Sequence, residues 1–334
     1  MEYFIAPGQT QYKANLHSHT VRSDGHTTPK ESVKRYKEHG YSILAITDHE
    51  APYDHSELTS DDFLLITGYE AYIRPSKLCK GNHYKPEIHL NLIAKEPGNV
   101  NLIGYNPVCC KYINIVEQMK LPHPDKYLWN REFTVEYIQK FIDSAVRNGY
   151  LVSLNHPCWS MQATEDVLKL KNYYSLEIFN YASMLVSGYA ENMPVYDAIL
   201  RSGNMVYCHG SDDNHNDYPL DHPLSDSFGA WTMIMADKLD YPSVIDALEK
   251  GKFYASTGPE IKVLGFDGNK VHIETSDVRR ITMHVTPKLS RVNMANKGQT
   301  VNSADFKIPS GAPYVYFSAI AEDGTRAYTH AFKV

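Results

Sequence analysis

Two histidines, an arginine and an aspartate lie close together in the stretch Asn15-Leu16-His17-Ser18-His19-Thr20-Val21-Arg22-Ser23-Asp24-Gly25. Residues two apart in a strand project from the same face, so His17 and His19 can approach one shared ligand. Neutral imidazole is a favoured ligand of zinc, iron and related cations. Because the chain has 16 histidines, one such pair arises readily by chance. Its meaning therefore depends on the rest of the chain.

Apolar runs alternate with helical patterns after this opening stretch. The runs that are typical of buried strands cover residues 42–47, 63–67, 88–94, 151–154, 176–179 and 205–208. The helical patterns cover residues 28–39, 135–149, 165–172, 194–201 and 241–250. Such alternation predicts a parallel α/β arrangement. Polar, metal-capable residues recur at the ends of successive runs, where an α/β barrel has its active site.

The character of the sequence changes near Gly258. Helical periodicity disappears, and short β-rich runs with hairpin turn signals follow to the end of the chain. We therefore expect two domains, an α/β barrel over 1–257 and a small, antiparallel, sandwich-like β domain over 258–334. The irregular segment 97–131 interrupts the α/β rhythm, and we expect either a substrate-facing loop or a loop packed for stability.

The bulk composition predicts a soluble, cytoplasmic globular protein, with 43% hydrophobic and 22% charged residues. A net charge of −6 argues against a dedicated nucleic-acid binder, although nucleotides and short oligonucleotides stay open. No secretory signal or membrane span is expected. Irregular cysteine spacing predicts free thiols in a reducing compartment, with a redox pair of Cys109 and Cys110 as the alternative. The five cysteines are Cys79, Cys109, Cys110, Cys158 and Cys208.

The candidate metal ligands follow the order of the strands. They are His17, His19, Asp24, His49, Glu70, His89, His156, Asp213 and His215. Nine nitrogen and oxygen ligands exceed the needs of one tetrahedral ion, and they suit two or three ions that share bridging carboxylates. Such a centre lowers the pKa of bound water and holds both the attacking and the leaving oxygen. Phosphate-ester hydrolysis is the chemistry that needs this most.

These motifs resemble those of the PHP (polymerase and histidinol phosphatase) superfamily of metal-dependent phosphoesterases. The matching motifs are His17-Ser18-His19-Thr20, Ser23-Asp24-Gly25, Thr47-Asp48-His49, Gly68-Tyr69-Glu70, His89, Asn155-His156-Pro157 and Asp213-Asn214-His215. The run Gly251-Lys252-Phe253-Tyr254-Ala255-Ser256-Thr257-Gly258-Pro259 is similar to the end of the PHP module in its CehA/McbA-like branch, which often carries an added β-domain. The resemblance implies a distorted (β/α)7 barrel with a trinuclear site at the C-terminal ends of the strands.

The resemblance also implies how the ligands divide among three ions. One ion would be held by His17, His19, Glu70 and Asp213, a second by Asp24, His49 and His215, and a third by Glu70, His89 and His156. His83 is an alternative to His89, and Asp212 is an alternative to Asp213. The histidinol-phosphatase type has a histidine where this chain has Asp24, so the metal preference of the second position can differ.

Further residues near the motifs have candidate roles in catalysis. Arg22 and Arg74 are candidates for binding a substrate phosphate, and His209 is a candidate proton donor to the leaving group. The residues expected to orient ligand side chains are Glu177, Asn180 and Asp212. For each of them the alternative is an ordinary structural or solvated side chain.

We therefore expect a hydrolase of small phosphate esters that contains two or three zinc, manganese or iron ions. A metal-bridging hydroxide would attack phosphorus, while the ions and a nearby arginine neutralise the developing charge. Two alternatives stay open at this point. One is a metal-dependent ester, amide or carbamate hydrolase, and the other is a metal-stabilised binding module without catalysis. The sequence pattern names neither the substrate nor the oligomeric state.

Overall fold

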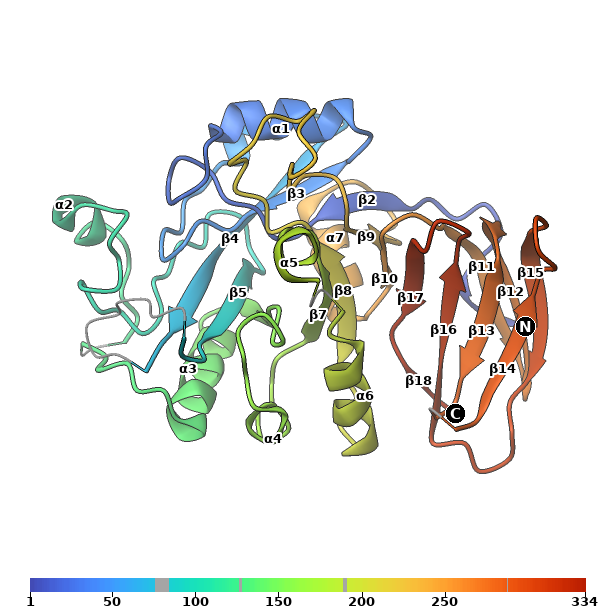
Figure 1. Ribbon diagram of the computed structural model, residues 1–334. Helices are drawn as coiled ribbons and strands as arrows, with labels where there is room; N and C mark the ends of the chain where they lie inside the picture. Colours follow the sequence, from blue (N-terminus) through green and yellow to red (C-terminus); the bar gives the residue numbers. More distant parts are fainter. Residues whose placement is uncertain (76–83, 126–127, 189–190, 287) are drawn as a thin grey trace.

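The computed structural model describes residues 1–334 except 76–83, 126–127, 189–190 and 287 (Figure 1). Its α/β part contains eight neighbouring strands of one large sheet. In spatial order they are β9 (Trp231–Ile234), β2 (Tyr12–Asn15), β3 (Ile43–Ile46), β4 (Leu64–Ile73), β5 (Ile88–Ala94), β6 (Tyr150–Leu154), β7 (Ser175–Asn180) and β8 (Tyr207–Ser211). β5 pairs antiparallel with both of its neighbours, whereas β2–β3–β4 and β6–β7–β8 are parallel ladders.

The expected distorted (β/α)7 barrel is not closed. β9 already pairs with β2 on one edge and with β10 (Phe253–Ser256) on the other. No main-chain edge of β9 is therefore left for β8, and a side chain makes the link instead. The Thr232 hydroxyl of β9 donates to Gly210 O of β8 at 2.8 Å. The coarser expectation of a mixed α/β fold is confirmed.

Helices cover the strands and begin where their capping residues predict. The helices are α1 (Pro29–Glu38), α2 (Ile115–Gln118), α3 (Val135–Arg147), α4 (Thr164–Val167), α5 (Tyr181–Ser187), α6 (Met193–Arg201) and α7 (Tyr241–Glu249), with a 3-10 turn at Ser56–Leu58. The Thr28 hydroxyl accepts from Glu31 N at 3.2 Å and caps α1 as predicted. The helix expected over 165–172 is shorter, because Asn172 has a left-handed φ of 65° and Lys171 N bonds to the Gln139 side chain.

The C-terminal part is an antiparallel β region, as expected. The large sheet continues from β10 into β17 (Arg326–Thr329), β16 (Tyr314–Ile320), β13 (Arg280–His284) and β14 (Ser290–Met294), and β18 (Phe332–Lys333) pairs with β16. A second sheet contains β1 (Glu2–Ile5), β11 (Ile261–Asp267), β12 (Lys270–Val278) and β15 (Val301–Lys307). Both sheets contribute to one apolar core that includes Ile273 and Phe317.

The N-terminal strand does not lie with the part of the sequence that follows it. β1 pairs with β11, and both chain ends lie at the β region (Figure 1). The domain division at residues 257 and 258 stays a prediction, and the structure shows the large sheet running through β10 across that point.

Two further expectations concern membrane-spanning helices and the state of the cysteines. No described helix is long and apolar enough to span a membrane. Cys109 is disulfide-bonded, so the expectation of free thiols throughout is wrong at that residue, whereas Cys110, Cys158 and Cys208 are free. The redox pair of Cys109 and Cys110 is also wrong, because Cys110 is a buried free thiol whose pKa is raised to about 12 by burial. Cys79 lies outside the described residues, and a cytoplasmic location stays a prediction.

Candidate metal centre

The nine predicted ligands lie together near one edge of the sheet, most of them just after a strand, whereas Glu70 lies within β4 and Asp24 lies in the loop after β2. His17 and His19 follow β2, His49 follows β3, and the ligands of the last motif follow β8. Parallel strands of one sheet end at the same edge, which explains this part of the cluster. His89 is the second residue of β5, and it reaches the same edge because β5 runs the other way.

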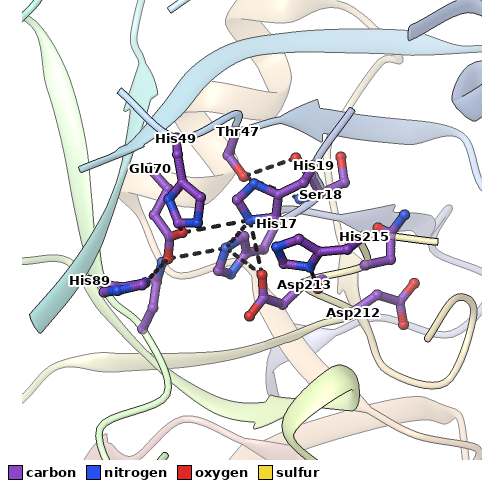
Figure 2. A network of polar contacts seen from close by, with 12 residues as sticks. His17, Ser18, His19, Thr47, His49, Glu70, His89, Asp212, Asp213 and His215 are labelled. Carbon is purple, nitrogen blue, oxygen red and sulfur yellow. Dashed lines mark hydrogen bonds and ion pairs between the residues drawn. The ribbon is translucent and has the colours of Figure 1, made fainter. Parts of the chain in front are cut away.

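Four side chains form the centre of the cluster (Figure 2). His17 Nε2 lies 3.2 Å from Glu70 Oε1 and 3.0 Å from Asp213 Oδ1. His19 Nε2 lies 3.0 Å from Asp213 Oδ1 and 3.2 Å from His17 Nε2. The four donor atoms lie within 4.8 Å of one another, so they could surround a single ion. They are the set that the family resemblance implies for the first ion.

A second group surrounds Asp24. The Asp24 carboxylate lies 3.7 Å from the nearest nitrogens of His19, His49 and His215. These separations are too long for hydrogen bonds, and Asp24 Oδ1 is buried without a hydrogen-bond partner. A cation among the four side chains would satisfy all of them. The predicted second set is thus assembled, with His19 as an additional member.

Glu70 connects these groups to the remaining ligands. Its Oε1 lies 3.1 Å from His89 Nδ1 and 3.4 Å from His156 Nε2, while its Oε2 lies 3.0 Å from His49 Nδ1. The structure therefore brings together the predicted third set. The tightest groupings nevertheless place His89 with His49 and Glu70, and His156 with His17 and Glu177. The alternative ligand His83 lies outside the described residues.

Burial and charge act in opposite directions on this cluster. Burial alone would lower the pKa of His17, but the carboxylates of Asp213, Glu70 and Glu177 raise it well above its ordinary value. The pKa of His89 rises to about 9 for the same reason, against the effect of burial. Burial would likewise raise the pKa of Glu70, yet the surrounding histidines hold it well below its usual range. The interior thus keeps charged carboxylates that need cations beside them.

The donor set fits divalent metal ions. His49 Nδ1 and Asp24 Oδ1 are buried, and neither has a hydrogen-bond partner, although His49 Nδ1 lies only 3.0 Å from Glu70 Oε2. The lone pairs of His49 Nδ1 and Asp24 Oδ1 are therefore placed to bind an ion rather than to accept a hydrogen bond from another side chain. The set contains imidazole and carboxylate groups and no thiolate, which suits zinc, manganese or iron at an oxygen-rich site.

Glu177 and Asn180 of β7 hold ligand side chains in place. Glu177 Oε1 lies 3.0 Å from His17 Nδ1, and because a carboxylate only accepts, Nδ1 carries the proton and Nε2 faces the cluster. Asn180 Nδ2 donates to Glu177 Oε2 at 2.9 Å and to Asp213 Oδ2 at 3.0 Å. This geometry is compatible with the orienting role expected of both residues, which stays a prediction.

Asp212 has a different environment from Asp213. Figure 2 shows its carboxylate turned away from the histidines. It accepts hydrogen bonds from the main-chain N–H groups of Phe228, Gly229 and Ala230 and from the Tyr36 hydroxyl. Asp212 therefore anchors a loop, and its carboxylate bonds to main-chain N–H groups and a phenol rather than to a candidate ligand.

Asp48 fixes the loop that carries Asp24. Its carboxylate accepts from Thr20 N, from the Thr20 hydroxyl and from the Ser23 hydroxyl, each at 2.7 Å. Gly25 closes the loop, because a Cβ there would lie 2.4 Å from His19 O. The position of Asp48 beside His49 was visible in the sequence, but its role depends on a contact between two separate loops.

The irregular segment 97–131 reaches the cluster at two residues that the sequence pattern did not single out. The Tyr112 hydroxyl donates to Asp24 Oδ2 at 2.6 Å. The buried Arg131 guanidinium donates to both oxygens of Glu50, the residue after His49, and to Tyr72 O at 2.7 Å. The segment therefore both faces the site and packs against the strands that carry it.

The cluster forms one wall of a cavity of about 670 Å³. Arg74 also lines it, with its guanidinium paired to Glu87 and 4.2 Å from the centre of the Tyr72 ring. The exposed Arg22 lies over the Tyr53 ring at 4.9 Å and is not among the described lining residues. The predicted phosphate-binding role is thus compatible with the position of Arg74 and is not supported by that of Arg22.

His209 lies behind the cluster rather than in the cavity. It is fully buried, its Nδ1 lies 2.8 Å from the Ser175 hydroxyl, and it is not among the described lining residues. Burial lowers its pKa to about 4, so the ring is neutral near pH 7. A neutral ring without access to the cavity is poorly placed to protonate a leaving group.

The fold and this cluster define an α/β protein with a candidate multinuclear metal centre. Residues 15–174, just under half of the chain, match the family model of the PHP domain. The match supports the resemblance seen in the sequence motifs, while the CehA/McbA-like branch stays a prediction. A comparison with curated proteins gives no match.

Three of the solved structures to which this chain is similar come from bacteria. A two-domain protein from Bacteroides vulgatus, described as containing a PHP-like metal-dependent phosphoesterase, is 15% identical, with 99% of this chain and 98% of that protein covered and a TM-score of 0.46. An amidohydrolase from Chromobacterium violaceum is 15% identical, with 60% and 87% covered and a TM-score of 0.39. A metal-dependent phosphoesterase from Bifidobacterium adolescentis is 14% identical, with 66% and 94% covered and a TM-score of 0.37.

Proposed function

We propose that this protein hydrolyses small phosphate esters in a reaction that depends on two or three divalent ions of zinc, manganese or iron. The observation that carries the proposal is the convergence of nine candidate nitrogen and oxygen ligands in neighbouring groups around Glu70 and Asp24, beside a cavity large enough for a small molecule. The PHP-domain match over residues 15–174 supports the same reading. The nine ligands are those predicted from the sequence.

The side chains of this chain would prepare the site in distinct ways. Bound divalent ions would supply Lewis-acid activation of a phosphoryl oxygen and of water. Glu177 keeps a proton on His17 Nδ1, so that Nε2 stays available as a ligand. Tyr112 fixes Asp24 by its hydrogen bond, and Arg74 offers positive charge to a phosphate in the cavity. The proposal gives no proton-donor role to His209 and no phosphate contact to Arg22.

The proposal is tested by metal content and by phosphate release. We expect the purified protein to carry at least one equivalent of transition metal, measured by plasma emission spectrometry. We expect it to release phosphate from small monoesters, and to lose this activity on chelation and regain it on adding zinc, manganese or iron. A protein that is fully loaded with metal and inactive on a panel of phosphate monoesters and diesters would refute the proposal and favour a binding module.

Hydrolysis of a carboxylic ester, amide or carbamate is a second candidate. The observation that favours it is the scarcity of positive charge in the cavity, because Arg74 is the only lysine or arginine among its described lining residues and is paired with Glu87. A phosphate dianion would gain from further cations. Comparing an aryl phosphate with the matching aryl acetate and aryl carbamate separates the candidates, since the preferred substrate should have the higher kcat/KM by a large factor.

A further inference from the structure

We infer that the cavity selects phosphate esters whose alcohol portion is a planar aromatic group, bound against Trp159. The inference rests on the proposed function and deepens it by naming the class of substrate. It follows from three observations on the wall that faces the metal cluster: its composition, its distance from the ligands, and the state of its polar groups.

The far wall of the cavity is apolar and is built from three separate segments. Trp159 comes from the loop after β6, Leu185 and Val186 come from α5, and Tyr218 and Leu224 come from the loop after β8. Trp159, Tyr218 and Leu224 are 41%, 43% and 42% exposed, and Val186 is 80% exposed. Large apolar side chains that face a shared cavity mark a site for an apolar group, because burying them against it removes their surface from water.

Trp159 stands at the boundary between the ligands and this wall. The centre of its indole ring lies 5.0 Å from that of His156 and 5.8 Å from that of His89, both in edge-on contacts. A phosphoryl group held at the cluster would therefore place the first atoms of its alcohol portion beside the indole. A flat ring can stack there or contact it edge to face, and both arrangements are favourable for aromatic pairs.

The two carboxylates of the cavity lining beside this wall already have partners, which makes them weaker acceptors for the hydroxyl groups of a sugar or another polyol. Asp226 accepts hydrogen bonds from the main-chain N–H groups of His215 and Asn216. Asp217 lies 3.1 Å from His26 Nδ1. Hydroxyl groups brought against this wall would lose their hydrogen bonds to water and regain few. An aromatic ring carries no such cost.

The test compares phosphate monoesters that all have a primary alcohol as the leaving group: benzyl phosphate, ethyl phosphate, glycerol 3-phosphate and glucose 6-phosphate. Because their leaving groups differ little in intrinsic reactivity, differences in kcat/KM report recognition. We expect benzyl phosphate to exceed glycerol 3-phosphate by about tenfold or more, the range for burying one aromatic ring. Equal rates, or a preference for either polyol, would overturn the inference while leaving the proposed function intact.

Substitutions at two positions of the wall, Trp159 and Val186, test whether the wall causes this preference. Trp159→Ala should reduce the ratio of benzyl to glycerol phosphate hydrolysis by about tenfold, mainly through KM for the benzyl ester, and Trp159→Phe should restore most of it. Val186→Ser should also lower the ratio of benzyl to glycerol phosphate hydrolysis. It should not disturb the packing of the core, because Val186 is largely exposed. Val292→Ser on β14 is the matched control, because Val292 is 52% exposed in the β region.

The outcomes separate this inference from the proposed function. A metal-loaded protein that hydrolyses none of the four monoesters defeats the inference, and the wider panel of monoesters and diesters then decides whether the proposed function falls as well. A protein that prefers benzyl phosphate but keeps that preference in both Trp159→Ala and Val186→Ser defeats the inference alone.

Discussion

In the metal cluster the pKa of buried His17 is raised well above its ordinary value, whereas in the C-terminal β region burial lowers the pKa of His330 to about 4. Both residues are buried. His17 has the carboxylates of Glu70, Asp213 and Glu177 around it. His330 has a main-chain carbonyl at 3.0 Å and the ring of Phe4 packed against it.

This difference shows that the two interiors are built for opposite charge states. An apolar surrounding favours the neutral imidazole, because burial disfavours charge. A surrounding of carboxylates requires positive charge, which either protons or metal ions can provide. His284 of β13 belongs with His330, since burial also lowers its pKa to about 4 and its Nε2 lies 2.8 Å from the Ser318 hydroxyl. Burial of a histidine alone therefore does not mark a metal site.

The largest expected effect comes from removing one carboxylate of the cluster. We expect Asp213→Asn to lower kcat/KM by well over 100-fold and to release metal, because loss of a mere outer partner of a metal ligand already costs about 10–100-fold. Metal content and phosphate release are measured on the same preparation. The variant His284→Gln, which changes a half-buried histidine outside the cluster, should keep both its metal content and its phosphate release. If both variants lost metal and activity equally, the proposed difference between the two regions would be wrong.

The cluster could be predicted from sequence because its motifs are local and fall at strand ends. His17 and His19, like Asp213 and His215, show their two-residue spacing directly. His89 was a candidate from the order of the apolar runs, and the resemblance favoured it over His83, but an apolar run such as Ile88–Ala94 looks the same in either direction. If β5 were parallel to its neighbours, His89 would lie at the edge of the sheet opposite the other ligands, because it stands near the start of the strand. Because β5 is antiparallel to its neighbours, His89 lies at the same edge as the other ligands.

Contacts between distant segments could not be predicted. Tyr112 meets Asp24 at a separation of 88 residues, and Arg131 meets Glu50 at a separation of 81. The segment that carries Tyr112 and Arg131 has no hydrophobic period that would place it. The pairing of β1 with β11 is equally distant, and nothing in the first residues indicates a partner at the other end of the chain.

A second prediction concerns the buried ion pair of Arg131 and Glu50 beside the cluster. We expect Arg131→Met to lower the free energy of unfolding by about 3–5 kcal/mol, because it leaves the Glu50 carboxylate buried without its partner. Urea unfolding followed by circular dichroism measures this loss. The double variant Glu50→Gln with Arg131→Met should recover part of it. If both variants are equally unstable, packing of the long side chain rather than its charge is responsible.

A third prediction uses the neutral histidines of the β region. The unfolded chain binds a proton near the ordinary histidine pKa, whereas folded His330 resists protonation down to about 4. Its contribution is therefore complete above the unfolded pKa and is lost as the pH falls toward 4. Between pH 7 and pH 5 we expect a loss of about 2 kcal/mol from this residue. His330→Gln should remove that part of the pH dependence in urea unfolding, and an unchanged pH dependence would show that the ring titrates normally.

The smallest expected effect is at the point where the irregular segment meets the cluster. Tyr112→Phe removes the hydrogen bond to Asp24 Oδ2 and keeps the ring that stacks beside His49. We expect kcat/KM to fall by up to about tenfold, the lower end of the range for partners of metal ligands, with little change in stability. The loss should shrink when the metal concentration is raised, because Asp24 would then be ordered by the ion rather than by the phenol. A loss that metal does not relieve would instead make Tyr112 a direct contact of the substrate.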